Sequence, residues 1–378
     1  MSLASLDCFS PDYCVARQRF REAAAESGWQ LERQPITARG PEGEELTLDV
    51  ALSPIEAGRA EREATLGVVV SSGLHGVEGA LGAAVQLAWL RDWAARQRLP
   101  SGVRLIFLQG LNPYGWAWSR RVNEEHVDPN RNFLLPGESY RGSPPGYAAL
   151  DRLLNPHVPP RRLDGFYLQA GAAILQHGLP ALKQAIAAGQ YDYPRGLFFG
   201  GHAPVESHRI LAEGLPRWTA GCSRVVHLDF HTGLGPWGTH KLLIDYPLRP
   251  EQRQRLADCF GAESLEVSGA RGVAYEARGG LGAWCFARQG EREYLYLCAE
   301  FGTYSPLRML AGLRAENQAT HWAGEGERGL AQVAEARRRL RELFCPAAAG
   351  WRSRTLSAGL NLVSRAANFL SPDRPQAR

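Results

Sequence analysis

Three residues in two separate segments carry the side chains of a metal site. His75-Gly-Val-Glu78 stands where a short apolar run ends and a helical pattern begins. An imidazole and a carboxylate three residues apart converge on one side of such a turn, so they can share one cation. His231 follows a second strand-like run, Arg224–Phe230. Two histidines and one glutamate, with one position left for water, are the ligands typical of a catalytic zinc site.

Each of these residues also has a simpler interpretation. A lone His-x-x-Glu pair is frequent by chance, and a core histidine beside a solvated glutamate at a helix start explains it without a metal. His227 alternates to the same strand face as His231, and His240 follows shortly after, so both compete for the role of ligand. Because His227 lies in mid-strand, we favour a packed and hydrogen-bonded core residue at that position.

Two further segments offer polar side chains that suit such a site. Asn130-Arg131 lies within the run Val127–Phe133, and a guanidinium offers a planar donor fork that matches a carboxylate. Without other evidence this segment is simply a surface loop. Glu300 ends the apolar run Tyr294–Ala299. A carboxylate at a sheet edge beside a metal-bound water is the expected general base.

Taken in order along the chain, five motifs resemble those of a known superfamily. They are His75-x-x-Glu78, Asn112-Pro-x-Gly, the run Asp128 to Phe133, His231, and Glu300-Phe-Gly-Thr. The set is similar to that of the M14-type zinc carboxypeptidases, and most of all to their bacterial DUF2817 branch. The succinylglutamate desuccinylases and aspartoacylases are related to these proteins. The resemblance covers roughly residues 66–306; each motif is weak alone, but five in this order are specific.

The resemblance implies the chemistry of the site. His75, Glu78 and His231 become the ligands of one zinc ion. Glu300 becomes the base that takes a proton from the zinc-bound water and delivers it to the leaving amine. Asp128 is implied to orient the imidazole of His75 through its other ring nitrogen.

The resemblance also implies contacts with the substrate. Arg121 polarises the scissile carbonyl, with the adjacent Arg120 as the competing position. Asn130 and Arg131 bind the free carboxylate of the substrate. A tyrosine is expected to hydrogen-bond the substrate, and the candidates are Tyr275, before a glycine-rich turn, and the alternatives Tyr246 and Tyr304.

One position departs from the family pattern. The usual Asp-Leu-Asn-Arg reads Asp128-Pro129-Asn130-Arg131 in this chain. Proline fixes φ and removes one backbone donor, which is a tolerable local change.

These implications predict a zinc-dependent, metallocarboxypeptidase-like hydrolase that cleaves an amide bond adjacent to a free carboxylate, as in a small peptide. The alternative is an N-acyl-amino-acid deacylase of the desuccinylase/aspartoacylase type, which acts on an acylated amino acid. The two differ in pocket depth, which residues 134–195 are expected to set. A catalytically silent metal- or ligand-binding protein is a second alternative, and it is disfavoured because ligands, base and anion-binding residues all occur together.

The elements that must position these residues alternate between strands and helices. Leu66–Ser72, a helical pattern over about 78–96 and Val103–Leu108 form a βαβ unit, which implies a parallel strand pair. The pattern predicts an α/β fold, namely a single zinc-carboxypeptidase-like domain with a mixed, mostly parallel central sheet flanked by helices. Ligand sites in such sheets lie at the carboxyl ends of strands. Further strands are expected at 46–52, 197–199, 224–230, 241–246 and 294–299, and helices at 14–27, 305–322 and 329–344.

The domain organisation follows from the same pattern. We expect one catalytic domain over residues 1–346, with an insertion at about 134–195 that holds two possible helices, and a C-terminal extension over 347–378. Gly233-Leu-Gly-Pro-Trp-Gly238 matches the dinucleotide-binding fingerprint. A strand-like run follows it where that fingerprint needs a helix, so we expect no nucleotide site there.

Composition excludes several classes of protein. The 378 residues are 44% apolar and 22% charged, which is typical of a globular chain. With 43 Lys and Arg against 39 Asp and Glu, the net charge of +4 is too small to indicate a nucleic-acid partner. The seven cysteines include no Cys-x-x-Cys pair, and the amino terminus has no signal-peptide pattern. The most apolar window, residues 66–90, contains His75, Glu78 and Gln86, so we expect a cytoplasmic protein without a membrane partner.

Overall fold

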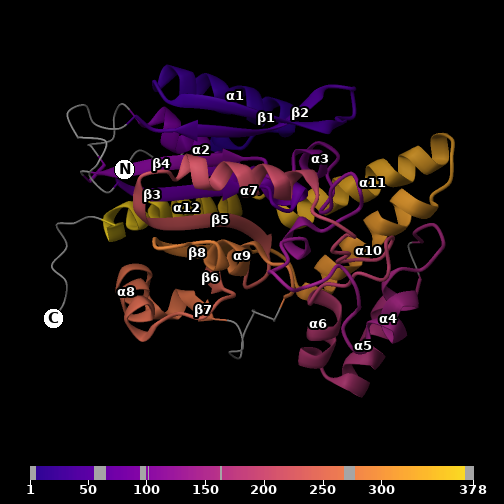
Figure 1. Cartoon of the computed structure of the whole chain (residues 1–378). Helices are drawn as coiled ribbons and strands as arrows, with labels where there is room; N and C mark the ends of the chain where they lie inside the picture. Colours follow the sequence, from indigo (N-terminus) through magenta and orange to yellow (C-terminus); the bar gives the residue numbers. More distant parts are fainter. Residues whose placement is uncertain are drawn as a thin grey trace.

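A single β-sheet lies between layers of helices at the centre of the molecule (Figure 1). The structure is a computed structural model that describes residues 6–54, 65–93, 99–100, 102–161, 164–267 and 277–370. Among these residues, eight strands form the sheet in the order β1-β2-β4-β3-β5-β8-β6-β7. The strands are β1 (Gln30–Arg39), β2 (Glu45–Leu52), β3 (Thr65–Ser72), β4 (Val103–Gln109), β5 (Cys222–Gly233), β6 (His240–Ile244), β7 (Leu265–Val267) and β8 (Glu293–Gly302).

The middle of the sheet is parallel and its margins are mixed. β3 pairs in parallel with β4 and with β5, and β5 pairs in parallel with β8. β2 joins β4 antiparallel on one side, and β6 joins β8 antiparallel on the other. The predicted α/β class with one mixed sheet is therefore confirmed, although the sequence pattern did not predict β1 and β7.

Helices cover both faces of the sheet. On one face α2 and α12 pack against β3 and β5, and Gly82 of α2 and Gly359 of α12 both lie close to the Phe230 side chain. α7 and α9 lie on the other face (Figure 1). The α-helices are α1 (Tyr13–Glu26), α2 (Gly79–Arg91), α3 (Pro113–Ala117), α4 (Tyr147–Leu154), α5 (Phe166–His177), α6 (Leu179–Ala187), α7 (Glu206–Trp218), α8 (Pro250–Phe260), α9 (Leu281–Ala287), α10 (Pro306–Trp322), α11 (Glu327–Phe344) and α12 (Ala349–Leu370). Short 3-10 helices occupy Leu6–Cys8, Gly76–Glu78, Pro129–Arg131 and Ala262–Ser264.

The C-terminal residues form part of the central layers. α12 buries Trp351, Leu356 and Val363 in the same apolar core that contains Phe230 of β5. Trp351 also donates a hydrogen bond from its indole nitrogen to the carbonyl of Gly302 at 2.9 Å. The segment that the sequence suggested as an extension thus packs against the strands that carry the candidate site.

The segment between β4 and β5 contributes a separate group of helices. α4, α5 and α6 lie together beyond the carboxyl edge of the sheet, at the lower right of Figure 1. The strand predicted at 197–199 is wrong, because Phe198 has a left-handed φ of 59° that breaks an extended run. Only an isolated bridge joins Gln190 to Phe199, and Phe198 packs instead with Val77 and Leu313.

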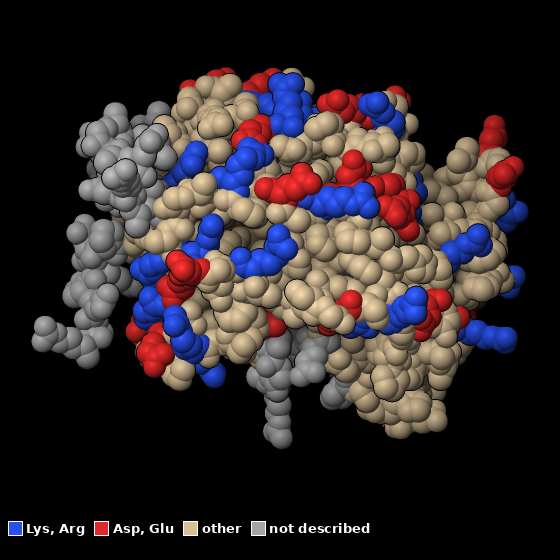
Figure 2. Space-filling model, in the orientation of Figure 1, with Lys and Arg blue, Asp and Glu red and all other residues tan. Residues whose placement is uncertain are grey.

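Charged side chains are dispersed over the surface. On the face shown in Figure 2, Lys and Arg lie among Asp and Glu over most of the molecule, and the region around α5 and α6 at the lower right is almost uncharged. Among the described helices, none has the length and hydropathy needed to cross a lipid bilayer.

Candidate metal centre

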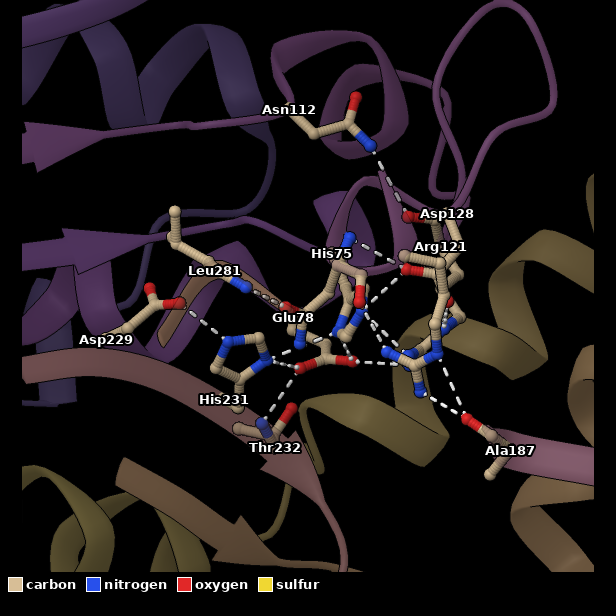
Figure 3. Close-up of polar contacts among 12 residues, drawn as sticks. His75, Glu78, Asn112, Arg121, Asp128, Ala187, Asp229, His231, Thr232 and Leu281 are labelled. Atoms are coloured by element: carbon tan, nitrogen blue, oxygen red, sulfur yellow. Dashed lines mark hydrogen bonds and ion pairs between the residues drawn. The ribbon is translucent and has the colours of Figure 1, made fainter. Parts of the chain in front are cut away.

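His75, Glu78 and His231 meet at the carboxyl edge of the parallel strands (Figure 3). His75 Nδ1 lies 3.0 Å from Glu78 Oε1, and His231 Nδ1 lies 3.1 Å from Glu78 Oε2 and 3.2 Å from His75 Nδ1. All three side chains are buried. The structure therefore turns two imidazole nitrogens and a carboxylate toward one point, a donor set that suits a divalent ion.

The outer ring nitrogen of each histidine faces a second carboxylate. His75 Nε2 lies 3.1 Å from Asp128 Oδ1, and His231 Nε2 lies 2.8 Å from Asp229 Oδ2. Such carboxylates fix the orientation of a ligating imidazole and increase its basicity, leaving Nδ1 for the metal. The family resemblance implied the role of Asp128, whereas the role of Asp229 was not predicted. The strand period could have indicated it, because residues two apart in a strand share one face and Asp229 lies two residues before His231 on β5.

Glycine brings the loop with Arg121 close to the metal ligands. A side-chain carbon on Gly76 would lie 2.1 Å from the backbone of Gly115, so no larger residue fits between the two segments. The neighbouring Val77 N–H donates to the carbonyl of Arg120 at 2.9 Å. Asn112 caps α3 by accepting from the Gly115 N–H at 2.9 Å, and its amide donates to the carbonyl of Arg121 at 3.3 Å. The Asn-Pro-x-Gly motif thus holds the arginine in place.

Ionised carboxylates surround the histidines. Burial opposes the charge of Glu78, but the imidazoles of His75 and His231 hold its pKa well below the usual range. Burial likewise opposes the charge of Asp229, and His231 outweighs it and lowers the pKa to about 2. Despite its burial, the pKa of His231 is raised well above its usual range by Asp229 and Glu78. The centre is therefore strongly attractive to a cation.

Glu300 lies beside His231 because of the register between β5 and β8, in which these two residues are direct partners. Its Oε1 accepts a hydrogen bond from the Leu234 N–H at 2.9 Å. Burial and the nearby charge of Glu78 raise the pKa of Glu300 to about 7. A carboxyl with that pKa can accept and release a proton at neutral pH, as a general base must.

The two adjacent arginines have different surroundings. Arg121 contacts Asp128 Oδ2 through Nε at 3.0 Å, and its terminal nitrogens lie 3.2 Å from Glu78 Oε1 and 2.7 Å from His75 Nε2. Arg120 points away and donates to Glu316 of α10 at 2.8 Å. Arg121 lines the cavity at the centre, whereas Arg120 belongs to a buried ion pair behind it.

Asn130 and Arg131 line the same cavity from the 3-10 helix at Pro129–Arg131. Proline fits there because the first helical position needs no N–H donor. Arg131 donates from Nε and Nη2 to the carbonyl of Ala187 at 3.0 and 2.7 Å. Asn130 Oδ1 accepts from the Leu281 N–H at 3.0 Å. These contacts fix both side chains at the end of α6 and the start of α9.

The candidate tyrosines occupy different places. Tyr304 lines the cavity and donates its hydroxyl hydrogen to Glu342 at 2.9 Å. Tyr246 is buried and donates to the carbonyl of Tyr296 at 2.9 Å, so its hydroxyl is committed within the core. Tyr275 lies outside the described residues.

The competing histidines lie apart from the metal ligands, whereas the glycine-rich segment lines the same cavity as these ligands. His227 is fully buried, with Ser71 Oγ 2.7 Å and Tyr294 Oη 2.9 Å from its ring nitrogens, so it is a core residue. His240 lies beside Phe301, with ring centroids 5.4 Å apart and the ring planes tilted by 32°. The segment Gly233–Gly238 leads into β6, which is a strand and not the helix of a dinucleotide site.

One cavity of about 1050 Å³ connects the three candidate metal ligands with Glu300, Arg121, Asn130 and Arg131. His75, Glu78, His231 and Glu300 line it at the sheet edge, and Cys298, two residues before Glu300, shares this lining. The sequence predicts a buried, reduced thiol at Cys298, and its place in the cavity lining follows from β8, because residues two apart in a strand share a face. The arrangement provides a cation site, a proton acceptor and several hydrogen-bond donors within one cavity, which are the parts needed to hydrolyse a carbonyl compound.

Comparison with known proteins gives one family and several similar folds. The family model described as "Protein of unknown function (DUF2817)" matches residues 9–358. No curated protein matches the sequence. The solved structures that are similar include carboxypeptidase A from Helicoverpa armigera, which is 14% identical with a TM-score of 0.49 over 88% of this chain and 74% of that chain. The succinylglutamate desuccinylase from Chromobacterium violaceum is 16% identical with a TM-score of 0.35 over 90% and 75%, respectively. The murein-tripeptide amidase from Escherichia coli O157 is 18% identical with a TM-score of 0.34 over 83% and 95%.

Proposed function

The chain belongs to the DUF2817 family, and from its buried His-Glu-His group we propose that it is a zinc-dependent hydrolase that cleaves an amide bond adjacent to a free carboxylate. The observation that carries the proposal is the position of Glu300, whose strand register places it beside His231. A purely structural metal site needs no such proton acceptor, because it is closed by four protein ligands.

The residues of the centre fit a zinc ion. His75 and His231 each present Nδ1 inward, and both outer nitrogens face a carboxylate, as is usual for ligating histidines. Glu78 supplies an anionic oxygen between them. A zinc ion held by these residues would supply Lewis acidity and would lower the pKa of water toward about 7.

The remaining residues have roles that follow from their positions. Glu300 accepts a proton from the attacking water and later gives it to the leaving amine nitrogen. Arg121 lies close enough to the ligands to stabilise negative charge on the carbonyl oxygen during attack. Asn130 and Arg131, at the cavity wall, orient the free carboxylate of the substrate.

The experiment that tests the proposal compares zinc-loaded wild-type protein with Glu300→Gln on peptides and N-acyl amino acids. We expect the variant to keep its zinc and to lose about 100- to 10,000-fold in kcat, which is the usual contribution of a positioned base. Glu327→Gln, at an exposed glutamate in the first turn of α11, is the matched control. Equal turnover by wild-type and Glu300→Gln protein refutes the proposal, and zinc binding by a wild-type protein that hydrolyses no amide identifies a silent metal-binding protein.

A further inference from the structure

The cavity at the metal centre continues into a region lined by hydrocarbon, which we call the apolar lobe. Its walls include Leu150 and Leu153 of α4, Ile174 of α5, Leu182 and Ile186 of α6, and Leu310 of α10. Among the described residues that α4, α5 and α6 contribute to the lining, the only polar side chains are Lys183 and Gln184. The inserted helices thus add an apolar compartment to a polar catalytic centre.

The chain's own side chains do not fill the apolar lobe. Leu153, Ile174, Ile186 and Leu310 pack onto a buried cluster around Leu154, yet each of these four remains only partly buried. Protein interiors are otherwise packed as densely as organic crystals, so apolar side chains left accessible inside a cavity indicate room for an apolar ligand.

The apolar lobe opens directly beside the substrate-binding residues. Ala187 ends α6, and its carbonyl accepts two hydrogen bonds from Arg131, while Ile186 lines the lobe one residue earlier. Phe198 also lines the cavity and packs beneath the guanidinium groups of Arg121 and Arg131, 5.4 and 5.9 Å from its ring centroid. A molecule with its carboxylate at Arg131 therefore has hydrocarbon walls within reach.

The helix that covers the lobe exposes large apolar side chains on its outer side, beside Gln169 and Gln176. α5, Phe166–His177, contains no Asp, Glu, Lys or Arg, and its Leu168 and Leu175 are 83% and 90% exposed. The corresponding part of Figure 2 is almost free of charged atoms. This composition suits a helix that meets amphiphilic molecules on one side and binds their chains on the other.

We propose that the apolar lobe binds the aliphatic chain of a long-chain N-acyl amino acid, which makes such amides the substrate class of this hydrolase. The inference rests on the proposed function. Water adds across the amide, so that the C–N bond breaks, the acyl carbon gains the hydroxyl as a fatty acid, and the nitrogen gains the proton of a free amino acid.

Two other occupants fit the apolar lobe less well. A short dicarboxylic acyl group leaves the lobe unfilled and brings a charge against hydrocarbon, which is unfavourable. A peptide brings amide N–H and C=O groups that leucine and isoleucine side chains cannot hydrogen-bond. A saturated chain has neither problem.

The test is the dependence of kcat/KM on chain length in a series of N-acylglycines from acetyl to hexadecanoyl, each below its micellar concentration. We expect kcat/KM to rise by up to about fourfold for each added methylene until the lobe is full. Ala173→Trp, on the inner side of α5, is expected to move the optimum to shorter chains. Ala172→Trp, on the exposed side, is expected to keep the wild-type profile.

The outcomes separate this inference from the proposed function. Hydrolysis of acetylglycine or short peptides with no gain from longer chains overturns the inference and leaves the hydrolase standing. A protein that hydrolyses no amide overturns the proposed function. A binding measurement then tests separately whether the apolar lobe takes up an acyl chain. Dodecanoylglycine should raise the thermal midpoint of the Glu300→Gln protein more than acetylglycine does, and equal shifts contradict the lobe assignment.

Discussion

Asp229 and His231 lie two residues apart on β5, and Asp229 Oδ2 accepts a hydrogen bond from His231 Nε2 at 2.8 Å. The same oxygen accepts from the Tyr296 hydroxyl at 2.7 Å, and Oδ1 accepts from Ser71 Oγ at 2.6 Å. Three donors from three neighbouring strands thus hold this carboxylate. Its position determines the direction in which His231 presents Nδ1 to the metal centre.

Removing the charge of Asp229 tests this relationship. We expect Asp229→Asn to weaken zinc affinity by about 10- to 100-fold, because the carboxylate orients the ligating imidazole and increases its basicity. Competition with a chromophoric chelator measures the affinity. Asp128→Asn should have a similar effect through His75, whereas Asp258→Asn, at an exposed site on α8, should have none. Unchanged zinc affinity in Asp229→Asn would show that its hydrogen bond serves only the core.

The adjacent arginines should respond differently to the same substitution. Arg121→Lys keeps the charge but cannot contact Asp128, Glu78 and His75 together, so we expect kcat to fall about 100- to 1000-fold with little change in stability. Arg120→Lys weakens the buried pair with Glu316, and we expect about 1–3 kcal/mol less stability with kcat retained. Steady-state kinetics and urea unfolding of both variants separate the effects. The reverse pattern would assign the carbonyl contact to Arg120.

The residues at or just beyond the carboxyl ends of the strands could be predicted from the sequence, because apolar runs locate the strands and parallel strands end at one edge. His75, His231 and Glu300 are examples, and the structure brings them together. The contrast between Arg120 and Arg121 could not be predicted, since it depends on Glu316, a residue of α10 distant in sequence. The position of Asp229 could also have been predicted, because residues two apart in a strand share a face and Asp229 lies two residues before His231.

The helices inserted between β4 and β5 show where hydrophobic periodicity fails to predict which residues line a cavity. Its three helices α4, α5 and α6 are short, and α5 is apolar around most of its surface, so hydrophobic periodicity does not mark which side faces a cavity. Leu197–Phe199 has the composition of a strand, but Phe198 has a left-handed backbone and belongs to a buried cluster with Val77 and Leu313, residues distant in sequence. The apolar lobe is therefore a property of the tertiary structure.

The close approach at Gly76 should be sensitive to a single methyl group. We expect Gly76→Ala to lower the free energy of unfolding by about 1–3 kcal/mol, because the added carbon meets the backbone of Gly115, which cannot move aside easily. Gly171→Ala on α5 is the control, since nothing lies within 4 Å of the added carbon, and alanine favours a helix by about 0.5–1 kcal/mol. Equal stabilities of the two variants, measured in urea, would contradict the account of the Arg121 loop.

His208 should make the metal-free protein less stable in acid. Burial lowers the pKa of His208 to about 4, with Arg288 adding to the shift and the Asn132 carbonyl opposing it. The unfolded chain therefore binds more protons between pH about 6.5 and 4, and stability falls as the pH falls through that range. We expect His208→Gln to reduce the stability difference between pH 7.5 and pH 5 by on the order of 1–2 kcal/mol. An unchanged difference in urea unfolding would contradict the shift.

The central claim is that His75, Glu78 and His231 bind one divalent ion, and anomalous diffraction at the zinc absorption edge tests it most directly. Crystals of protein incubated with one equivalent of zinc should show one peak at this site, about 2.0–2.2 Å from His75 Nδ1, a Glu78 carboxylate oxygen and His231 Nδ1. Crystals of His231→Ala protein prepared in the same way should lack that peak. Wild-type crystals without a peak between these three residues, or with zinc bound elsewhere, would contradict the account.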